Sequence, residues 1–451
     1  MARILMISYA FPPLRGAESI VTTNYATNLP KRGYEVMVLT GVPHLREADP
    51  EPNKQCPDSA PVYRVNSLED LVLALVSRMH IGHEKEKTSL SAAGIRGDVG
   101  GGLVILDALR RFKLVPNHVS GWAFLAAIKG RALTKKFRVD YLVSRSNPVT
   151  SHLAALRLKG NSRIPWVACF SDPWALDPNP PYYDRYWSSA IMSKVNENLE
   201  RKVVEKADRI VFTTQDQRSM YARKYERFER KFVVIPNSYD PKNYQKVSSS
   251  HSCDKHDRKF TIVHSGSLMR ARSPEPFYKA LSLLREKKDK ITENIRVILV
   301  GESSTFSQLI SEYGLDGIIQ NVGPVSREEA LKYVFGADLL LLMDAPSAGR
   351  SVFLPSKLLD YIQTNRPILG ITPEGAAADV IRKTQTGTVV TSYNPEEIGR
   401  VLTGYYSAFV NGTSALQPKW NEIQEYSIDR CIQRFINVLE ELRSEEYGTS
   451  T

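Results

Sequence analysis

The sequence predicts an α/β protein of two doubly wound domains, each built around a parallel sheet. At 451 residues, the chain exceeds the roughly 250 to 300 residues that one hydrophobic core serves. Short apolar runs alternate with helix-like stretches, and this rhythm starts again after a polar stretch near residue 250. The composition, 42% hydrophobic and 24% charged, is typical of a chain that buries such cores. We expect domains at residues 1–238 and 239–420, followed by a closing helix and tail at 421–451.

The first domain is predicted from strands that alternate with helices. An apolar run at residues 3–8 precedes a helix-like stretch at 18–31, and Gly33 leads into a second run that ends at Thr40. Short apolar runs spaced in this way are typical of buried parallel strands joined by crossover helices. The same pattern predicts further strands at the following residues: 139–144, 166–170 and 209–214.

Residues 43–115 interrupt this pattern. They contain a charged, proline-containing stretch, an apolar helix candidate at 68–79 and a glycine-rich piece at 97–102. A long irregular insertion in an α/β domain usually has a function or is mobile. We therefore expect these residues to form an irregular element that serves the function of the domain.

The second domain follows a linker at residues 234–259, and its predicted strands lie at these residues: 260–266, 296–301, 318–322, 339–343 and 367–371. Apolar residues recur at helical spacing over residues 426–442, and no strand follows them. This last segment is predicted to be a closing helix.

The formal net charge of +11 is concentrated in one half of the chain. Residues 1–238 hold 35 Lys and Arg against 23 Asp and Glu, whereas residues 239–451 hold 25 against 26. Such a field suits an anionic membrane surface or a phosphorylated lipid, although a solvated basic surface that serves solubility is an equal alternative. A nucleic-acid partner is not expected, because zinc-finger, RNP-like and basic-heptad patterns are missing from the sequence.

The cysteines and the apolar runs bear on location. Four scattered cysteines, Cys56, Cys169, Cys253 and Cys431, form no paired motif and are expected to be reduced thiols without zinc. The N-terminal apolar run is too short for a signal peptide, and no run reaches the roughly 18 to 20 apolar residues that span a bilayer. We expect a cytoplasmic chain that can lie peripherally at the inner face of a membrane.

Three loops carry candidate binding residues at predicted strand ends. In the first domain, Gly16 precedes a helix, where small residues let a ligand approach free backbone N–H groups, although a plain helix start explains the pattern equally well. In the second domain, Gly266 follows a strand and is accompanied by Arg270 and Arg272. Backbone access beside two guanidinium groups suits a diphosphate, and solvated arginines are the alternative.

The third loop, at residues 353–361, is the most informative. Pro355 and Ser356 can start a helix whose first turn would bind phosphate, with Lys357 supplying a cation. Asp360 lies one turn further on the same face and can accept hydrogen bonds from ribose hydroxyls. An ordinary capped helix with a Lys–Asp pair is the alternative.

Polar residues also follow two strands of the first domain. Asp172 ends the strand at residues 166–170, where it can orient a hydroxyl group or cap a loop. Arg145 and Asn147 follow the preceding strand and can line a pocket or pack a loop.

The chain resembles the GT-B glycosyltransferases of family 4, the retaining group 1 glycosyltransferases. The matching stretches run in order along nearly the whole chain at these residues: 4–16, 32–40, 200–214, 234–240, 266–272, 323–325, 337–338 and 355–367. Each stretch alone is modest, but the ordered set is specific. Only the insertion at 43–115 lies outside the resemblance.

The resemblance implies two Rossmann-like domains that face each other across a cleft. The second domain would hold a nucleotide-sugar donor through Gly266, Val325 and the 355–360 loop, with Gly16 contributing from the first domain. The first domain would hold the acceptor, with residues 43–115 as an acceptor-side element. Arg272 and Lys357 would stabilise the leaving diphosphate, and Asp172 would act at the reacting sugar. Retention by front-face attack and independence of metal and other cofactors are implied as well.

The sequence departs from the family pattern at several positions. The family commonly carries two Glu with seven residues between them. This chain has Val352 at the first of these positions and Asp360 at the second. Ser267 stands where a basic residue often follows the loop glycine. The Pro-Ser-Lys start occurs in one branch of the family, which assigns the phosphate contact to Lys357.

These observations favour a transferase that acts on a glycan or lipid-linked acceptor in polysaccharide or glycoconjugate biosynthesis. The departures at Val352 and Ser267 support an alternative, a catalytically weak GT-B module that binds a nucleotide sugar or glycan within an assembly. A GT-B epimerase or phosphorylase is less favoured, because neither a convincing pyridoxal phosphate lysine nor a pair of epimerase-type acids is evident.

Overall fold

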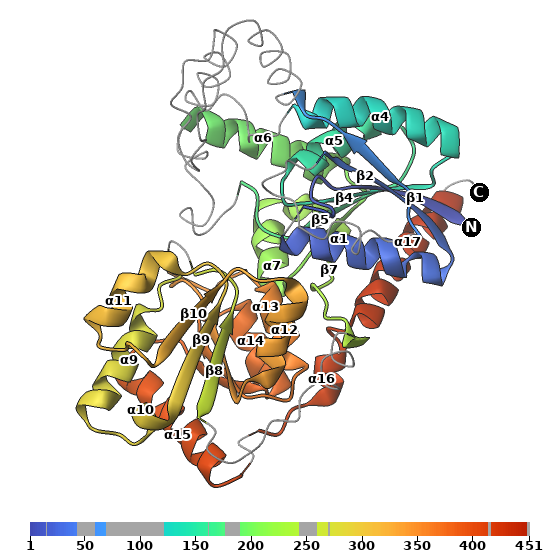
Figure 1. Cartoon of the computed structure of the whole chain (residues 1–451). Coiled ribbons are helices and arrows are strands. Elements are labelled where there is room, and N and C mark those ends of the chain that lie inside the picture. The colour runs from blue at the N-terminus through green and yellow to red at the C-terminus, as the bar shows by residue number, and fades with distance from the viewer. Residues whose placement is uncertain are drawn as a thin grey trace, which may run out of the picture. The chain divides into compact units, whose positions relative to one another are not determined.

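The computed structural model of the protein consists of two compact units (Figure 1). The first unit comprises Met1–Phe212, Met220–Val233 and Ile436–Thr451, and the second comprises Thr213–Ser219 and Val234–Phe435. The structure describes the following residues: 1–14, 16–42, 59–68, 121–160, 162–175, 190–242, 259–268, 271–413 and 416–448. Most of the predicted insertion and the candidate residue Arg270 lie outside them.

The first unit contains a seven-stranded sheet in the order β3-β2-β1-β4-β5-β6-β7. Its strands are β1 (Ala2–Ile7), β2 (Tyr34–Gly41), β3 (Val62–Val65), β4 (Tyr141–Arg145), β5 (Trp166–Phe170), β6 (Arg209–Phe212) and β7 (Phe232–Val234). Its helices are α1 (Ala17–Asn28), α4 (Trp122–Phe137), α5 (Thr150–Lys159), α6 (Ala190–Lys206), the second half of α7 (Gln215–Lys224) and the last part of α17 (Ile428–Gly448).

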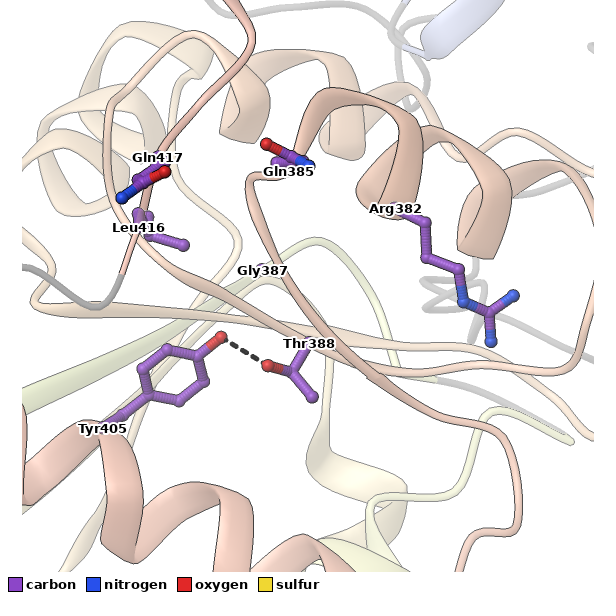
Figure 2. Close-up of a pocket in the computed structure, with 7 residues that line it drawn as sticks. All are labelled: Arg382, Gln385, Gly387, Thr388, Tyr405, Leu416 and Gln417. Carbon is purple, nitrogen blue, oxygen red and sulfur yellow. Dashed lines mark hydrogen bonds between the residues drawn. The ribbon is translucent and has the colours of Figure 1, made fainter.

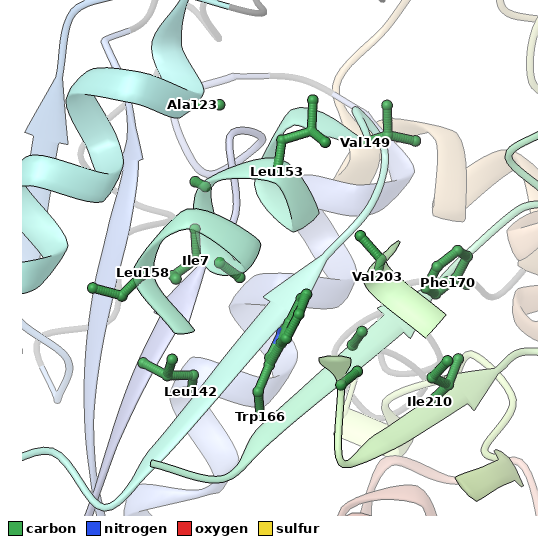
Figure 3. Close-up of a cluster of buried hydrophobic side chains, with 14 of the residues drawn as sticks. Ile7, Ala123, Leu142, Val149, Leu153, Leu158, Trp166, Phe170, Val203 and Ile210 are labelled. Atoms are coloured by element: carbon green, nitrogen blue, oxygen red, sulfur yellow. The ribbon is translucent and has the colours of Figure 1, made fainter. Parts of the chain in front are cut away.

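Helices α4, α5 and α6 share one apolar layer with the first sheet. Leu5 and Ile7 of β1 belong to a cluster with residues of these helices, whereas the alternate residues Ile4 and Met6 are buried outside it. Figure 3 shows this cluster, with labelled side chains contributed by β1, β4, β5 and β6 and by the three helices. Both sets of β1 side chains are buried because a parallel sheet is covered on both faces, which explains the continuous apolar runs in the sequence.

The edge strand β3 is a difference from the sequence prediction, which treated residues 43–115 as irregular. Val62–Val65 pair in parallel with Val38–Gly41 of β2. All four residues of β3 are only partly buried, because an edge strand packs on one side alone. A four-residue run with an arginine at its third position lacks the apolar signal of the central strands. The helix candidate at 68–79 lies outside the described residues from position 69 onward.

The second unit contains a six-stranded sheet in the order β10-β9-β8-β11-β12-β13, with every neighbouring pair parallel. Its strands are β8 (Phe260–Ser265), β9 (Ile295–Val300), β10 (Ile319–Gly323), β11 (Leu339–Met343), β12 (Ile368–Ile371) and β13 (Gly387–Val390). Its helices are α9 (Glu275–Glu286), α10 (Ile291–Asn294), α11 (Ser307–Glu312), α12 (Arg327–Gly336), α13 (Ser356–Ile362), α14 (Ala376–Thr384), α15 (Pro395–Val410), α16 (Trp420–Gln424) and the first part of α17.

Successive strand residues of the second sheet belong to two different apolar layers. Ile262 of β8 clusters with residues of α9 and α15, and its neighbour Val263 clusters with residues of α12, α13 and α14. Strand side chains alternate between the faces of a sheet, so each layer covers one face. Leu358, Leu359 and Ile362 fix α13 in the second layer. This packing determines where the polar residues of α13 lie.

When the strands are numbered within each unit, the second sheet has the order 3-2-1-4-5-6, and the first sheet has the same order with a seventh strand at its end. This is the order of the doubly wound Rossmann fold, in which the strand order reverses beside the first strand. The prediction of two Rossmann-like α/β domains is confirmed.

Candidate donor site and acceptor-side residues

The candidate donor site of the second unit lies where its strand order reverses. Strands β8 and β11 are neighbours in the sheet, but the chain leaves them in opposite directions along it. The carboxyl ends of these strands are followed by Gly266 and Asp344. Ligands of open α/β sheets bind outside the strand ends at such a switch point. The sequence-predicted residues around Gly266 therefore lie at the part of the fold that generally binds ligands.

Two glycines allow the backbone segments to approach closely at these strand ends. Gly266 has φ +110° and Gly301, which follows β9, has φ +126°. A Cβ atom on Gly301 would lie 2.7 Å from the carbonyl carbon of Gly266, and a Cβ atom on Gly266 would lie 2.7 Å from Nζ of Lys357. The ammonium group of Lys357 thus occupies the space that a side chain on Gly266 would fill. The structure brings the predicted pair Gly266 and Lys357 together.

Lys357 is held by a histidine that the sequence analysis did not single out. The Nζ atom of Lys357 lies 3.0 Å from Nε2 of His264, and Nδ1 of His264 lies 2.8 Å from the carbonyl oxygen of Leu341. A carbonyl oxygen only accepts, so Nδ1 carries the proton and Nε2 accepts a hydrogen bond from Lys357. His264 is completely buried. Burial and the charge of Lys357 hold the pKa of His264 well below its usual value, so the ring is neutral.

Arg272 is oriented by Asp344, which follows β11. The Nε atom of Arg272 donates to Oδ1 of Asp344 over 3.1 Å, and the backbone N–H of Ala345 donates to the same oxygen over 3.0 Å. Asp344 is 3% exposed, whereas the side chain of Arg272 is 30% exposed. A carboxylate that is buried beside a partly exposed guanidinium group holds that group at the strand ends, where it remains accessible to an anion.

Asp360 is close to the other candidates in sequence but is engaged by a residue of another helix. Its Oδ1 atom accepts a hydrogen bond from Nη2 of Arg327, the first residue of α12, over 2.9 Å. Burial raises the pKa of Asp360, and the charge of Arg327 opposes that rise. The carboxylate therefore has one fixed cationic partner before any ribose hydroxyl is considered.

The remaining candidates of the second unit surround this group. Ser356 begins α13, and Pro355 precedes it with an extended ψ of 128°. Val325 lies between β10 and α12 and packs against the layer that contains α13. Val352, where the family commonly has Glu, is buried and its carbonyl oxygen accepts from Oγ1 of Thr214 over 2.8 Å.

In the first unit, Arg145 is bound within its own fold. Its Nε atom donates to Oε1 of Glu18 over 2.8 Å, and its guanidinium carbon lies 4.6 Å from the ring centre of Tyr25. Glu18 lies in the first turn of α1, the helix that begins directly after Gly16. The other carboxylate oxygen of Glu18 accepts a hydrogen bond from the hydroxyl group of Ser171. Burial raises the pKa of Glu18, and the Arg145 charge opposes this rise. Arg145 is 3% exposed, so its main contacts are internal.

Asn147 and Asp172 lie together in the same unit. The side-chain amide nitrogen of Asn147 donates to Oδ2 of Asp172 over 2.6 Å. These residues follow β4 and β5, which are neighbouring strands. The sequence analysis named both residues separately, and the structure pairs them at the carboxyl edge of the sheet.

Sequence reasoning missed His264, Asp344, Arg327 and Glu18. His264 and Asp344 lie at or just after strands that the sequence analysis had located, so inspection of each strand's carboxyl end would have found them. Arg327 and Glu18 lie in first helical turns, where an ion pair across the fold leaves no local signal.

Other features of the described residues are separate from this site. A pocket of about 500 Å³ in the second unit is lined by none of the candidate residues (Figure 2). Its lining residues are Arg382, Gln385, Gly387, Thr388, Tyr405, Leu416 and Gln417. Within the described ranges, no cluster of three His, Cys, Asp or Glu residues is arranged to hold a metal ion. Nor does any described helix have the length and apolar character needed to cross a membrane.

Comparison with known proteins identifies the family and agrees with the fold. The model of the glycosyl transferase 4-like domain matches residues 16–238, and the model of glycosyl transferases group 1 matches residues 249–406. Two Rossmann-like units with basic residues at the switch point of the second define a protein of the GT-B class. Because the two models together cover most of the chain, it belongs to the group 1 glycosyltransferase family.

Individual relatives are distant. A D-inositol 3-phosphate glycosyltransferase of Pseudarthrobacter chlorophenolicus is 23% identical over 220 residues, which cover 46% of this chain and 49% of the relative. The chain spans about half the length of the curated relatives it matches. Among solved structures, Anabaena HepE in complex with UDP has a TM-score of 0.63 at 12% identity, with 98% of this chain and 100% of HepE covered. WaaG, a glycosyltransferase involved in lipopolysaccharide biosynthesis, has a TM-score of 0.55 at 14% identity, with 96% of this chain and 94% of WaaG covered.

Proposed function

We propose that the protein is a glycosyltransferase that moves a sugar from a nucleoside diphosphate sugar to a glycan or lipid-linked acceptor. The observation that carries this proposal is the group formed by Gly266, Lys357 and Arg272 at the switch point of the second unit. Two basic side chains beside a glycine, whose backbone a ligand can approach, suit a diphosphate. Membership of the group 1 glycosyltransferases supports the assignment of that diphosphate to a sugar donor.

The proposed reaction breaks the bond between the anomeric carbon and the oxygen of the β-phosphate. The acceptor oxygen attacks from the face that the diphosphate leaves and forms the new bond to the anomeric carbon, so the configuration is retained. The proton of the acceptor hydroxyl passes to the leaving diphosphate. Negative charge grows on the diphosphate as the bond breaks. Lys357 and Arg272 would stabilise that charge, and because both are held in place beforehand, little reorganisation is needed. This route requires no metal ion.

The donor nucleotide is supported by one neighbour in structure. Anabaena HepE has been solved in complex with UDP and with UDP-glucose. We propose that Asp360 contacts the ribose of a comparable donor, with Arg327 holding the carboxylate in place. Pro355, Ser356 and Val325 would complete the donor site.

The acceptor is proposed to bind the first unit, beside Asn147 and Asp172. The excess of 35 Lys and Arg over 23 Asp and Glu in residues 1–238 suits an acceptor or membrane surface that carries negative charge. WaaG acts in lipopolysaccharide biosynthesis, which is consistent with a role in polysaccharide or glycoconjugate synthesis and a peripheral location at the inner membrane face.

Binding and hydrolysis of nucleotide sugars test this proposal. A panel of UDP-, GDP- and ADP-sugars is incubated with the protein in the presence of EDTA, and the release of nucleoside diphosphate is measured. One nucleotide class should bind and turn over, and Arg272→Ala should lower kcat by about 100-fold, because it removes a cation that stabilises the leaving group. Arg285→Ala, an exposed arginine on α9, is the matched control. Failure of every nucleotide to bind would refute the proposal.

A second candidate function is a catalytically weak module that binds a nucleotide sugar within an assembly. It is favoured by the apolar, buried Val352 at a position where the family commonly has an acid. The same panel separates the two functions. Tight nucleotide binding without turnover, unchanged by any acceptor, would support the module.

A further inference from the structure

Lys357 differs from the other cations of the donor site in the groups that contact it. Arg272 pairs with Asp344 and Arg327 pairs with Asp360, whereas Lys357 makes no ion pair within 4.0 Å with a carboxylate of the described residues. Its Nζ atom contacts the neutral ring of His264 at 3.0 Å and lies against Gly266. The lysine side chain is partly buried. An ammonium group that is partly removed from water and has no carboxylate in direct contact loses its proton more readily than an exposed one.

Burial and the charge of a neighbouring arginine also lower the pKa of Lys357. Burial and the charge of Arg272 lower the pKa of Lys357 to about 7, and only Asp344 opposes them. Asp344 already accepts hydrogen bonds from Arg272 and from the backbone of Ala345. Asp360, one turn further along α13, is held by Arg327 of α12. Without a ligand, the amine of Lys357 therefore titrates near neutral pH, well below the usual range of a lysine.

His264 makes Lys357 the group that gains the proton. Its Nδ1–H donates to the carbonyl of Leu341, and its Nε2 atom accepts from Lys357. Burial and the nearby Lys357 and Arg272 charges all lower the pKa of His264. The ring therefore stays neutral and serves as a fixed acceptor that aims the Lys357 amine. Any proton that enters this part of the site is expected on Lys357.

We propose that Lys357 and His264 form a proton-linked anion receptor, in which Lys357 takes up one proton when a nucleoside diphosphate binds beside Gly266. The proposal rests on the proposed function, which places the donor diphosphate at this site. A bound diphosphate supplies the negative charge that the site lacks, so it favours the ammonium form of Lys357. By linkage, affinity for the nucleotide must fall as pH rises above neutrality, because a proton has to be bound together with the ligand.

Isothermal titration calorimetry of the wild-type chain with UDP and GDP tests the linkage. Titrations at pH 8 in buffers of different ionisation enthalpy, none of them phosphate, count the protons that are taken up. We expect close to one proton per nucleotide at pH 8 and an affinity about tenfold lower at pH 8 than at pH 6.5. The β-phosphate is already ionised at pH 8, and the cations of the site favour its ionised form, so it should neither release nor take up a proton on binding.

Three variants test whether Lys357 is the group that takes up the proton when the nucleotide binds. Lys357→Arg keeps a cation that does not titrate, so it should bind nucleotide equally at both pH values without proton uptake. Lys357→Met should weaken binding at pH 6.5 and also abolish the uptake. Lys279→Met removes an exposed lysine of α9 and should behave as the wild type.

The outcomes separate this proposal from the proposed function. Nucleotide binding without proton uptake, with an affinity that does not change with pH, would overturn the proposal of a proton-linked receptor. The transferase proposal would be unaffected. Uptake that persists in Lys357→Arg would also overturn it, because the proton would then go elsewhere. No nucleotide binding even at pH 6.5 would overturn both.

Discussion

The carboxylate of Asp360 has one partner in the structure and a second in the proposed reaction. Arg327 donates to its Oδ1 atom over 2.9 Å, and the proposed ribose contact would need the other acceptor positions of the carboxylate. A carboxylate accepts several hydrogen bonds at once, so the two roles are compatible. Substitutions on each side of the pair distinguish a binding role from a purely structural one.

Asp360→Asn is predicted to weaken nucleotide affinity by about 10- to 100-fold, because hydrogen bonds to a charged group contribute about 1.5 to 3 kcal/mol. Arg327→Gln, which removes the partner and retains the carboxylate, should weaken affinity much less. Both variants are measured by titration with the nucleotide that the wild type binds and by thermal unfolding. Equal losses of stability with unchanged affinity in both variants would show that the pair is only structural.

His264 is predicted to matter through Lys357. In His264→Phe the ammonium group loses its acceptor, and the carbonyl of Leu341 loses its donor, so nucleotide affinity at pH 6.5 should fall by about tenfold. His264→Gln restores a side-chain acceptor and should recover part of the affinity. Titration of both variants at pH 6.5 checks this. If His264→Phe bound nucleotide as tightly as the wild type, His264 would not be a positioning residue.

The loops after β8 and β9 depend on each other, because their backbones pack closely together. The backbone of Gly266 lies where a Cβ atom of Gly301 would be, and both glycines have positive φ. The chain therefore brings Gly266 toward Lys357 only if the neighbouring loop carries no side chain. This requirement links two loops that are 35 positions apart in the sequence.

Gly301→Ala is predicted to destabilise the second unit by about 1 to 3 kcal/mol, because it combines a strained backbone conformation with a contact of 2.7 Å to the Gly266 carbonyl carbon. Nucleotide binding should weaken as well, since the Gly266 loop must shift. Thermal unfolding and nucleotide titration measure the two effects. Gly336→Ala is the control, because a Cβ atom there meets no atom within 4 Å; similar losses in both variants would contradict the prediction.

At the scale of the whole molecule, the last helix is divided between the two units. In α17, residues up to Phe435 group with the second unit, and residues from Ile436 onward group with the first. Leu439 is completely buried, and its carbonyl oxygen accepts from the hydroxyl group of Tyr141 in β4 over 3.1 Å. The first unit, which begins at the N-terminus, is thus completed by the C-terminal segment.

Leu439→Ala is predicted to destabilise the first unit by about 2 to 5 kcal/mol, the cost of a cavity in a packed core. Chemical denaturation followed by tryptophan fluorescence measures the loss, since Trp122, Trp166 and Trp174 are buried in this unit. Glu440→Ala changes an exposed neighbour on the same helix and should leave stability within about 0.5 kcal/mol. Equal effects of the two changes would show that the segment does not contribute to the core.

The two-domain α/β fold, the central strands and the family can be recognised from the amino-acid sequence alone. Buried parallel strands are apolar on both faces, so runs such as residues 339–343 are visible without any knowledge of their neighbours. Gly266, Lys357 and Arg272 were also recognisable, because glycine next to basic residues at a strand end is a local pattern. The edge strand β3 was missed, since partial burial leaves it without a strong apolar run.

Which charged and polar side chains contact each other depends on the tertiary structure. His264 and Lys357 are 93 positions apart, and Arg272 and Asp344 are 72 positions apart. Such pairs leave no periodicity in the sequence, because they depend on how β8, β11 and α13 pack across the sheet. The same holds for the pairing of Arg145 with Glu18 and for the place of residues 436–451 in the first unit. Local pattern therefore specified the strands and their loops, whereas long-range packing specified the chemical environment of each side chain.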